Sequence, residues 1–119
     1  DGPIIIGGFS QGAAIASAML EHEIQNRIVG LVLLGTKTVR PEKLREILPF
    51  IRSRKVAWMH GSRDHLVPLE QGLEHLEIFE QAGWDVIILE HDKGHMVNLN
   101  QLGELKSGIQ NMADSIDYK

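Results

Sequence analysis

Hydrophobic runs of strand length alternate along the chain with segments in which apolar residues recur at helical spacing. Four runs predict buried strands, at residues 3–6, 28–34, 55–60 and 85–90. Four helices are expected after them, at about residues 11–22, 41–51, 69–82 and 99–115. Buried strands that alternate with helices are typical of a parallel sheet covered on both faces. The order β-α-β-α-β-α-β-α therefore predicts an α/β fold.

Two of the helices carry more detailed expectations. Pro49 lies inside the apolar spacing that starts at Pro41, so it should end or kink that helix. The helix at 69–82 should turn one apolar stripe inward, formed by Leu69, Leu73, Leu76, Phe79 and Ala82.

The composition is that of an ordinary globular protein. The 119 residues are 43% hydrophobic and 24% charged, with a net charge of −4, and residues 1–119 are expected to belong to a single domain. Without cysteine the chain has no disulfide, thiolate metal site or cysteine nucleophile. No basic run suggests a nucleic-acid partner, and no apolar run reaches the roughly 20 residues of a membrane span. No signal peptide is visible, and we expect a cytoplasmic location.

A serine flanked by glycines joins the first strand to the first helix. The stretch Gly8-Phe9-Ser10-Gln11-Gly12 follows the apolar run and opens into a segment of small residues. The chain must reverse there within very few residues, which calls for positions without side chains, and we expect Gly8 and Gly12 to provide them. This is the G-x-S-x-G pattern of a nucleophile elbow, in which the serine hydroxyl is exposed at the tip of the turn.

An aspartate and a histidine follow two later strands. Asp64 comes after the third strand and His95 after the fourth, and the carboxyl ends of parallel strands meet at one edge of the sheet. A histidine can take the proton of a serine hydroxyl, and a carboxylate can orient that histidine. Asp64 could instead cap the turn that contains it, and Asp92 is a competing acid. His91 is the rival of His95, but we favour His95 because Gly94 would let its loop bend.

The remaining histidines are expected to serve structure. His22 and His75 fall on helices and should be solvated or partly packed, His60 should pack beneath the site, and His65 should lie at the surface. No two histidines on a helix have the i, i+4 spacing, with a carboxylate between them, of a common zinc motif. We therefore expect no metal and no organic cofactor.

With these loops in view, the chain resembles the phospholipase/carboxylesterase family of α/β-hydrolases, which includes the acyl-protein thioesterases. The matching segments are residues 7–13, 60–68 and 94–97. The resemblance implies Ser10 as nucleophile, Asp64 as acid, His95 as base and the backbone N–H of Gln11 as an oxyanion donor. It also implies that the chain is the C-terminal half of the domain. Family members have several strands before the serine turn, and a loop there supplies a second oxyanion donor.

The expected function is that of a serine carboxylic-ester hydrolase acting on a small-molecule or lipid ester or thioester. The strand Pro3-Ile4-Ile5-Ile6 would then need a neighbour, either an N-terminal half or a second copy of the chain. With one oxyanion donor, activity should be weak. The alternatives are a peptidase or amide hydrolase on the same fold, and a non-catalytic interaction domain that keeps a relic triad. The loop at 35–40 matches none of the three family segments.

Overall fold

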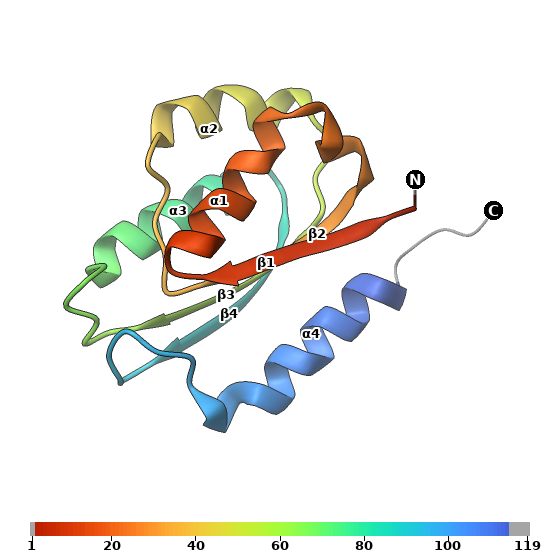
Figure 1. The fold of residues 1–119 in the computed structure, drawn as a ribbon. Coiled ribbons are helices and arrows are strands. Elements are labelled where there is room, and N and C mark those ends of the chain that lie inside the picture. The colour runs from red at the N-terminus through yellow and green to blue at the C-terminus, as the bar shows by residue number, and fades with distance from the viewer. Residues whose placement is uncertain (1, 115–119) are drawn as a thin grey trace.

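The computed structural model describes residues 2–114 and contains a four-stranded parallel sheet (Figure 1). The strands lie in the order of the sequence: β1 (Ile4–Phe9), β2 (Ile28–Leu34), β3 (Lys55–Gly61) and β4 (Asp85–His91). All three neighbouring pairs are parallel, so every strand ends at the same edge of the sheet. This arrangement confirms the predicted α/β fold.

Helices cover both faces of the sheet. Figure 1 shows on which face of the sheet each helix lies. The first face carries α1 (Gln11–Ala18), α2 (Pro41–Ile47) and α3 (Leu69–Gln81), and the second carries α4 (Leu102–Asp114). None of the helices in residues 2–114 combines the length and the apolar character needed to cross a lipid bilayer.

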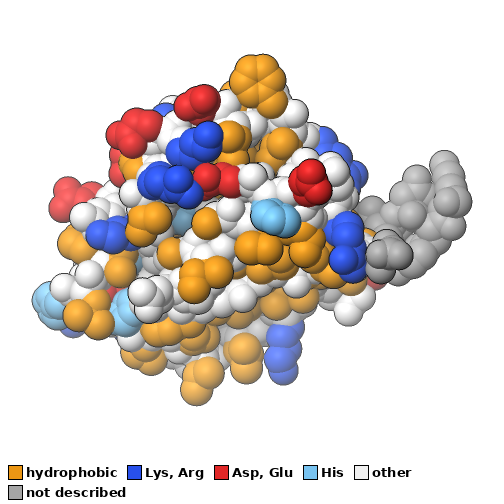
Figure 2. Space-filling view, turned by 45° about the horizontal axis from the view of Figure 1, so that its top comes forward, with side chains coloured by type: hydrophobic (Ala, Val, Ile, Leu, Met, Phe, Trp, Pro, Cys, Tyr) orange, Lys and Arg blue, Asp and Glu red, His pale blue; other side chains and the backbone are white. Residues whose placement is uncertain are grey.

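Each face of the sheet has its own hydrophobic layer. Alternate residues of a strand point to opposite faces, so neighbours such as Leu31 and Val32 enter different layers. The layer beneath α1, α2 and α3 includes Leu31, Val56 and the ring of Phe79, while the layer toward α4 includes Val32, Met59 and Met112. Charged side chains of both signs gather on the upper part of the face shown in Figure 2, and hydrophobic side chains predominate on its lower part.

Three of the helices are shortened by a 3₁₀ turn at one end. The first helix ends at Ala18 and continues only as the 3₁₀ turn Met19–Glu21. It stops there because His22 has an extended backbone, and the His22 ring accepts a hydrogen bond from the N–H of Ile24. The second helix gives way after Ile47 to a 3₁₀ turn that contains Pro49, as predicted. The last helix starts as the 3₁₀ turn Leu99–Gln101, and Ser115 lies outside the described residues.

The inner stripe expected for α3 is partly wrong. Leu76 and Phe79 are buried, but Leu73 is 38% exposed, and Gly72 and His75 take the inner positions. The cause is a close approach between α3 and β3. A Cβ on Gly72 would lie 2.5 Å from the ring of His60, and the carbonyl of Gly72 accepts a hydrogen bond from the indole of Trp58. This contact rotates the helix so that Gly72 faces the sheet and Leu73 turns outward.

Candidate active site

Ser10 makes the whole connection between β1 and α1. It has φ 57° and ψ −118°, and it is the one non-glycine residue with a positive φ in residues 2–114. Its backbone N–H donates to the carbonyl of Leu34 on β2, which ties the turn to the sheet. A residue with a side chain rarely adopts this conformation, so the surrounding structure must impose it.

The two glycines of the serine motif differ in their surroundings. A Cβ on Gly8 would lie 2.7 Å from the carbonyl carbon of Gly12, so the return of the helix over the strand requires glycine at position 8. A Cβ on Gly12 would meet no atom of the described residues within 4 Å. Within this part of the chain, therefore, the expected need for glycine holds at Gly8 and is not found at Gly12.

The structure brings Ser10, His95 and Asp64 into one series of hydrogen bonds. The Nε2 atom of His95 lies 2.8 Å from the Ser10 hydroxyl, and its Nδ1 atom lies 2.6 Å from Oδ2 of Asp64. With the proton on Nδ1 donated to the carboxylate, Nε2 is free to accept the hydroxyl proton. The three residues follow β1, β3 and β4, so the parallel sheet alone brings them to one edge.

Asp64 is held by its own turn as well as by His95. Its Oδ1 atom accepts hydrogen bonds from the backbone N–H groups of Leu66 (2.9 Å) and Val67 (2.8 Å), and Oδ2 faces His95. Burial by itself raises the pKa of Asp64, but the hydrogen bonds from Val67, His95 and Leu66 outweigh it and lower the pKa overall. The capping role and the contact with the histidine, weighed as alternatives from the sequence, thus occur together.

Phe9 and Gly35 fix the ring of His95 from the side. The rings of Phe9 and His95 have centroids 4.7 Å apart, and the side chain of His95 is 15% exposed. Gly35 has φ +59°, and a Cβ there would lie 3.2 Å from the Phe9 ring and 3.6 Å from the His95 ring. The imidazole is therefore supported on one side and still open to solvent.

Gly61, and not Gly94 as expected, is the glycine that the His95 loop requires. A Cβ on Gly94 would make only an ordinary contact, 3.6 Å from the carbonyl oxygen of Arg63. A Cβ on Gly61, at the end of β3, would collide with the carbonyl oxygens of Lys93 and Gly94. The loop that carries His95 reaches the sheet because position 61 has no side chain.

Two histidines near the site have structural contacts. His91, the rival base, is buried, and its Nδ1 accepts a hydrogen bond from the N–H of Lys93. Burial lowers the pKa of His91. His60 packs beneath the site as expected: its Nε2 donates to the carbonyl of Val67 at 2.8 Å and lies 3.6 Å from Oδ2 of Asp64. His60 thereby supports the turn that carries Asp64.

The expectation for His75 is wrong, because its side chain is fully buried between α1 and α3. Its Nε2 lies 2.9 Å from the hydroxyl of Ser17, and burial lowers its pKa to about 4. A signal for this burial was present, since His75 precedes Leu76 and lies one turn before Phe79 on the inner face of α3. His22 and His65 are exposed, as expected.

In residues 2–114, no three histidine, aspartate or glutamate side chains gather to hold a metal ion.

A cavity of about 320 Å³ opens beside Ser10. Its lining residues are Ser10, Gln11, Ala14, Thr36, Lys37, Val39 and Val67. Gln11 is the first residue of α1, so its N–H lies outside the helical hydrogen-bond pattern and is free to bind a ligand. The wall from the loop at 35–40 was not anticipated from the sequence. The sequence did indicate that this loop follows β2, which places it at the same edge of the sheet as the other three loops.

Solved structures of esterases share this fold. The Bacillus cereus carboxylesterase aligns with 92% of this chain and 50% of its own, with a TM-score of 0.71 and 20% identity. Acyl-protein thioesterase 2 of Zea mays aligns with 92% of this chain and 56% of its own, with a TM-score of 0.71 and 17% identity. The chain thus spans about half the length of these structures. A search of curated proteins finds no match.

A family assignment comes from the sequence itself. The profile described as Phospholipase/Carboxylesterase matches residues 1–113, nearly the whole chain. The match includes the serine turn and the two loops that carry Asp64 and His95. This chain therefore belongs to the phospholipase/carboxylesterase family of α/β-hydrolases.

Proposed function

We propose that this chain is the later half of a single hydrolase domain that cleaves carboxylic esters or thioesters through an acyl-enzyme intermediate. The observation that carries the proposal is the hydrogen-bond series from the Ser10 hydroxyl through His95 to Asp64. A serine hydroxyl becomes a useful nucleophile only when a base takes its proton, and the imidazole of His95 is within reach of it. Family membership points to the same chemistry.

Each residue has one role in the proposed reaction. Oγ of Ser10 attacks the substrate carbonyl carbon while Nε2 of His95 takes the hydroxyl proton. The protonated His95, stabilised by Asp64, then gives that proton to the leaving alcohol or thiol. The N–H of Gln11 donates to the oxyanion of the tetrahedral intermediate. Water attacks the acyl-enzyme in a second round with His95 as base, which releases the acid and restores Ser10.

A second part of the domain completes the site in this proposal. β1 is an edge strand in the described sheet, and the solved structures of the fold are about twice as long. An unpaired apolar edge favours association, so a preceding half of the domain or a second copy of the chain would lie against β1. That half would supply the second oxyanion donor. Loss of one such donor lowers turnover about 100- to 1000-fold, so the 119-residue chain should be a slow enzyme.

Esters and thioesters are favoured over peptides as substrates. The aligned structures include proteins named as a carboxylesterase and an acyl-protein thioesterase. A non-catalytic domain with a relic triad is disfavoured, because such a domain has no need to keep all three side chains in hydrogen-bonding positions. The cytoplasmic location stays a prediction.

Turnover of small activated esters tests the proposal. The purified chain should hydrolyse 4-nitrophenyl acetate and a short acyl thioester slowly, and it should leave a peptide amide intact. Replacement of Ser10 by alanine should reduce the rate to the buffer background. Hydrolysis that persists in the Ser10→Ala protein would contradict the assigned nucleophile. Full-rate hydrolysis by the unmodified chain would contradict the incomplete oxyanion site.

A further inference from the structure

The cavity beside Ser10 has a wall that the proposed hydrolytic reaction does not use. This wall is the loop at 35–40, which follows β2 and contributes Thr36, Lys37 and Val39 to the lining. Ala14 on α1 and Val67 also belong to the lining. Lys37 is the one charged residue among the seven that line the cavity. The rest of the lining is apolar or uncharged.

The loop is anchored on both sides of Lys37. Before it, Gly35 donates its N–H to the carbonyl of Met59 on β3, and the buried hydroxyl of Thr36 donates to the carbonyl of Lys37 at 3.3 Å. After it, Arg40 binds both carboxylate oxygens of Glu21, at 2.9 and 3.1 Å. Lys37 is therefore carried on a short segment with two fixed ends.

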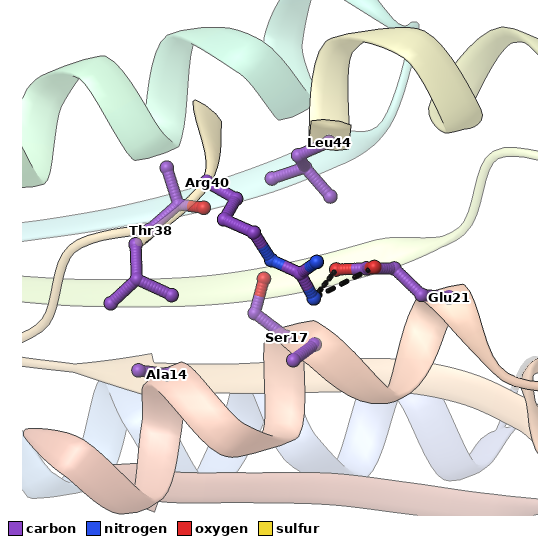
Figure 3. A pocket seen from close by; sticks show the side chains of 8 residues that line it. Ala14, Ser17, Glu21, Thr38, Arg40 and Leu44 are labelled. Carbon is purple, nitrogen blue, oxygen red and sulfur yellow. Dashed lines mark hydrogen bonds and ion pairs between the residues drawn. The ribbon is translucent and has the colours of Figure 1, made fainter. Parts of the chain in front are cut away.

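The loop also packs onto α1. Figure 3 shows the side chain of Arg40 extending from the loop toward Glu21, above Ser17. Only about 10 Å³ of space remains in the small pocket that these residues line. The loop and α1 thus form one packed unit, and the cavity beside Ser10 keeps its wall without a bound ligand.

The charge of the cavity is unbalanced. No aspartate or glutamate belongs to its lining, and the first turn of α1 contains no acidic residue. The carboxylate of Glu21, which lies against the loop, forms an ion pair with Arg40 and not with Lys37. Within residues 2–114, the ammonium group of Lys37 forms no ion pair and no hydrogen bond, and the side chain is exposed. The positive end of the α1 dipole adds to the same potential.

We propose, on the basis of the hydrolase function above, that Lys37 directs this site toward acyl chains that end in an anionic group such as a carboxylate. His95 does not line the cavity, and the leaving group must lie at His95 to receive its proton. The cavity therefore holds the acyl part of the substrate. Ala14, Val39 and Val67 contact its methylene groups, and Lys37 pairs with its charged end. Lys37 is a specificity-determining residue in this proposal.

A pair of esters with equal chain length tests the proposal by kinetics. The substrates are the mono-4-nitrophenyl ester of adipic acid, which ends in a carboxylate, and 4-nitrophenyl hexanoate, which does not. The ratio of their kcat/KM values should fall about three- to tenfold in Lys37→Gln and further in Lys37→Glu. Lys43→Gln, at an exposed lysine on α2, is the matched control and should leave the ratio unchanged. An unchanged ratio in both Lys37 variants overturns the proposal.

A binding measurement separates this proposal from the hydrolase function. In the Ser10→Ala protein, NMR titration should show tighter binding of the adipate ester than of the hexanoate ester. The added change Lys37→Gln should abolish that difference. If the difference appears but wild-type protein hydrolyses neither ester, the anionic preference stands and the hydrolase function fails. If the two esters bind equally, the anionic preference is wrong whatever the rate of hydrolysis.

Discussion

Replacement of His75 by glutamine should reduce the acid sensitivity of folding between about pH 7.5 and pH 5 by about 2 kcal/mol. His75 is fully buried against Ser17, and burial lowers its pKa from 6.5 to about 4. In the unfolded chain the His75 imidazole therefore binds a proton near pH 6.5, whereas in the folded protein it does so only near pH 4. Stability from this source is complete above pH 6.5 and is lost as the pH falls toward 4.

The size of the effect follows from the two pKa values. A difference of about 2.5 corresponds to about 3.4 kcal/mol at full protonation, and about 2 kcal/mol of this is lost by pH 5. Most carboxylates are still ionised at that pH, so they contribute little to the difference. A loss of about 2 kcal/mol is large beside the 5–15 kcal/mol total stability of a typical domain.

Urea unfolding followed by tryptophan fluorescence measures the effect, because Trp58 and Trp84 are both buried. The free energy of unfolding should drop between the two pH values by about 2 kcal/mol more in the wild-type protein than in His75→Gln. His65→Gln, at an exposed histidine, is the control and should behave as wild type. Equal drops in wild type and His75→Gln would refute the burial argument.

Three further substitutions test the site and its support. Asp64→Asn should lower kcat for ester hydrolysis by up to about 10⁴-fold with little change in KM, because the amide favours the wrong tautomer of His95. An effect confined to KM would argue against an orienting role of Asp64. Gly72→Ala should destabilise the fold by about 1–3 kcal/mol in urea unfolding, because its Cβ would lie 2.5 Å from the ring of His60. An unchanged unfolding midpoint would show that the helix and the ring have room for the added methyl group. Ser10→Gly should raise thermal stability by about 1 kcal/mol while abolishing activity, because glycine adopts φ 57° without strain; a lower Tm would contradict the strain at this turn.

Local patterns located the four strands, although β1 runs to Phe9, three residues beyond the end expected from sequence. The continuous apolar run at 28–34 coincides with β2, since a strand buried on both faces needs hydrophobic residues throughout. Ser10, Asp64 and His95 could be grouped from sequence because parallel strands place the residues that follow them at one edge. Their hydrogen bonds could not be derived from sequence, since these depend on the turn around Asp64 and on the ring of Phe9.

The errors arose where tertiary contacts outweigh local spacing. The orientation of α3 depends on the fit of Gly72 against the ring of His60, two residues that no helical pattern connects. His75 is a polar residue on an apolar face, and its partner Ser17 lies on a different helix. Gly61 rather than Gly94 admits the His95 loop, because the collision would come from a backbone distant in sequence. The cavity wall with Lys37 carries no motif at all.

Mass-spectrometric mapping of a fluorophosphonate adduct shows whether Ser10 is an activated nucleophile. These probes react with a serine whose hydroxyl is activated by a neighbouring base. We expect one adduct, on Ser10, and much slower labelling of the same serine in His95→Gln and Asp64→Asn proteins that remain folded. A folded wild-type protein that stays unlabelled at Ser10, or a His95→Gln protein that is labelled equally fast, would contradict the assignment of Ser10 as a nucleophile activated by His95.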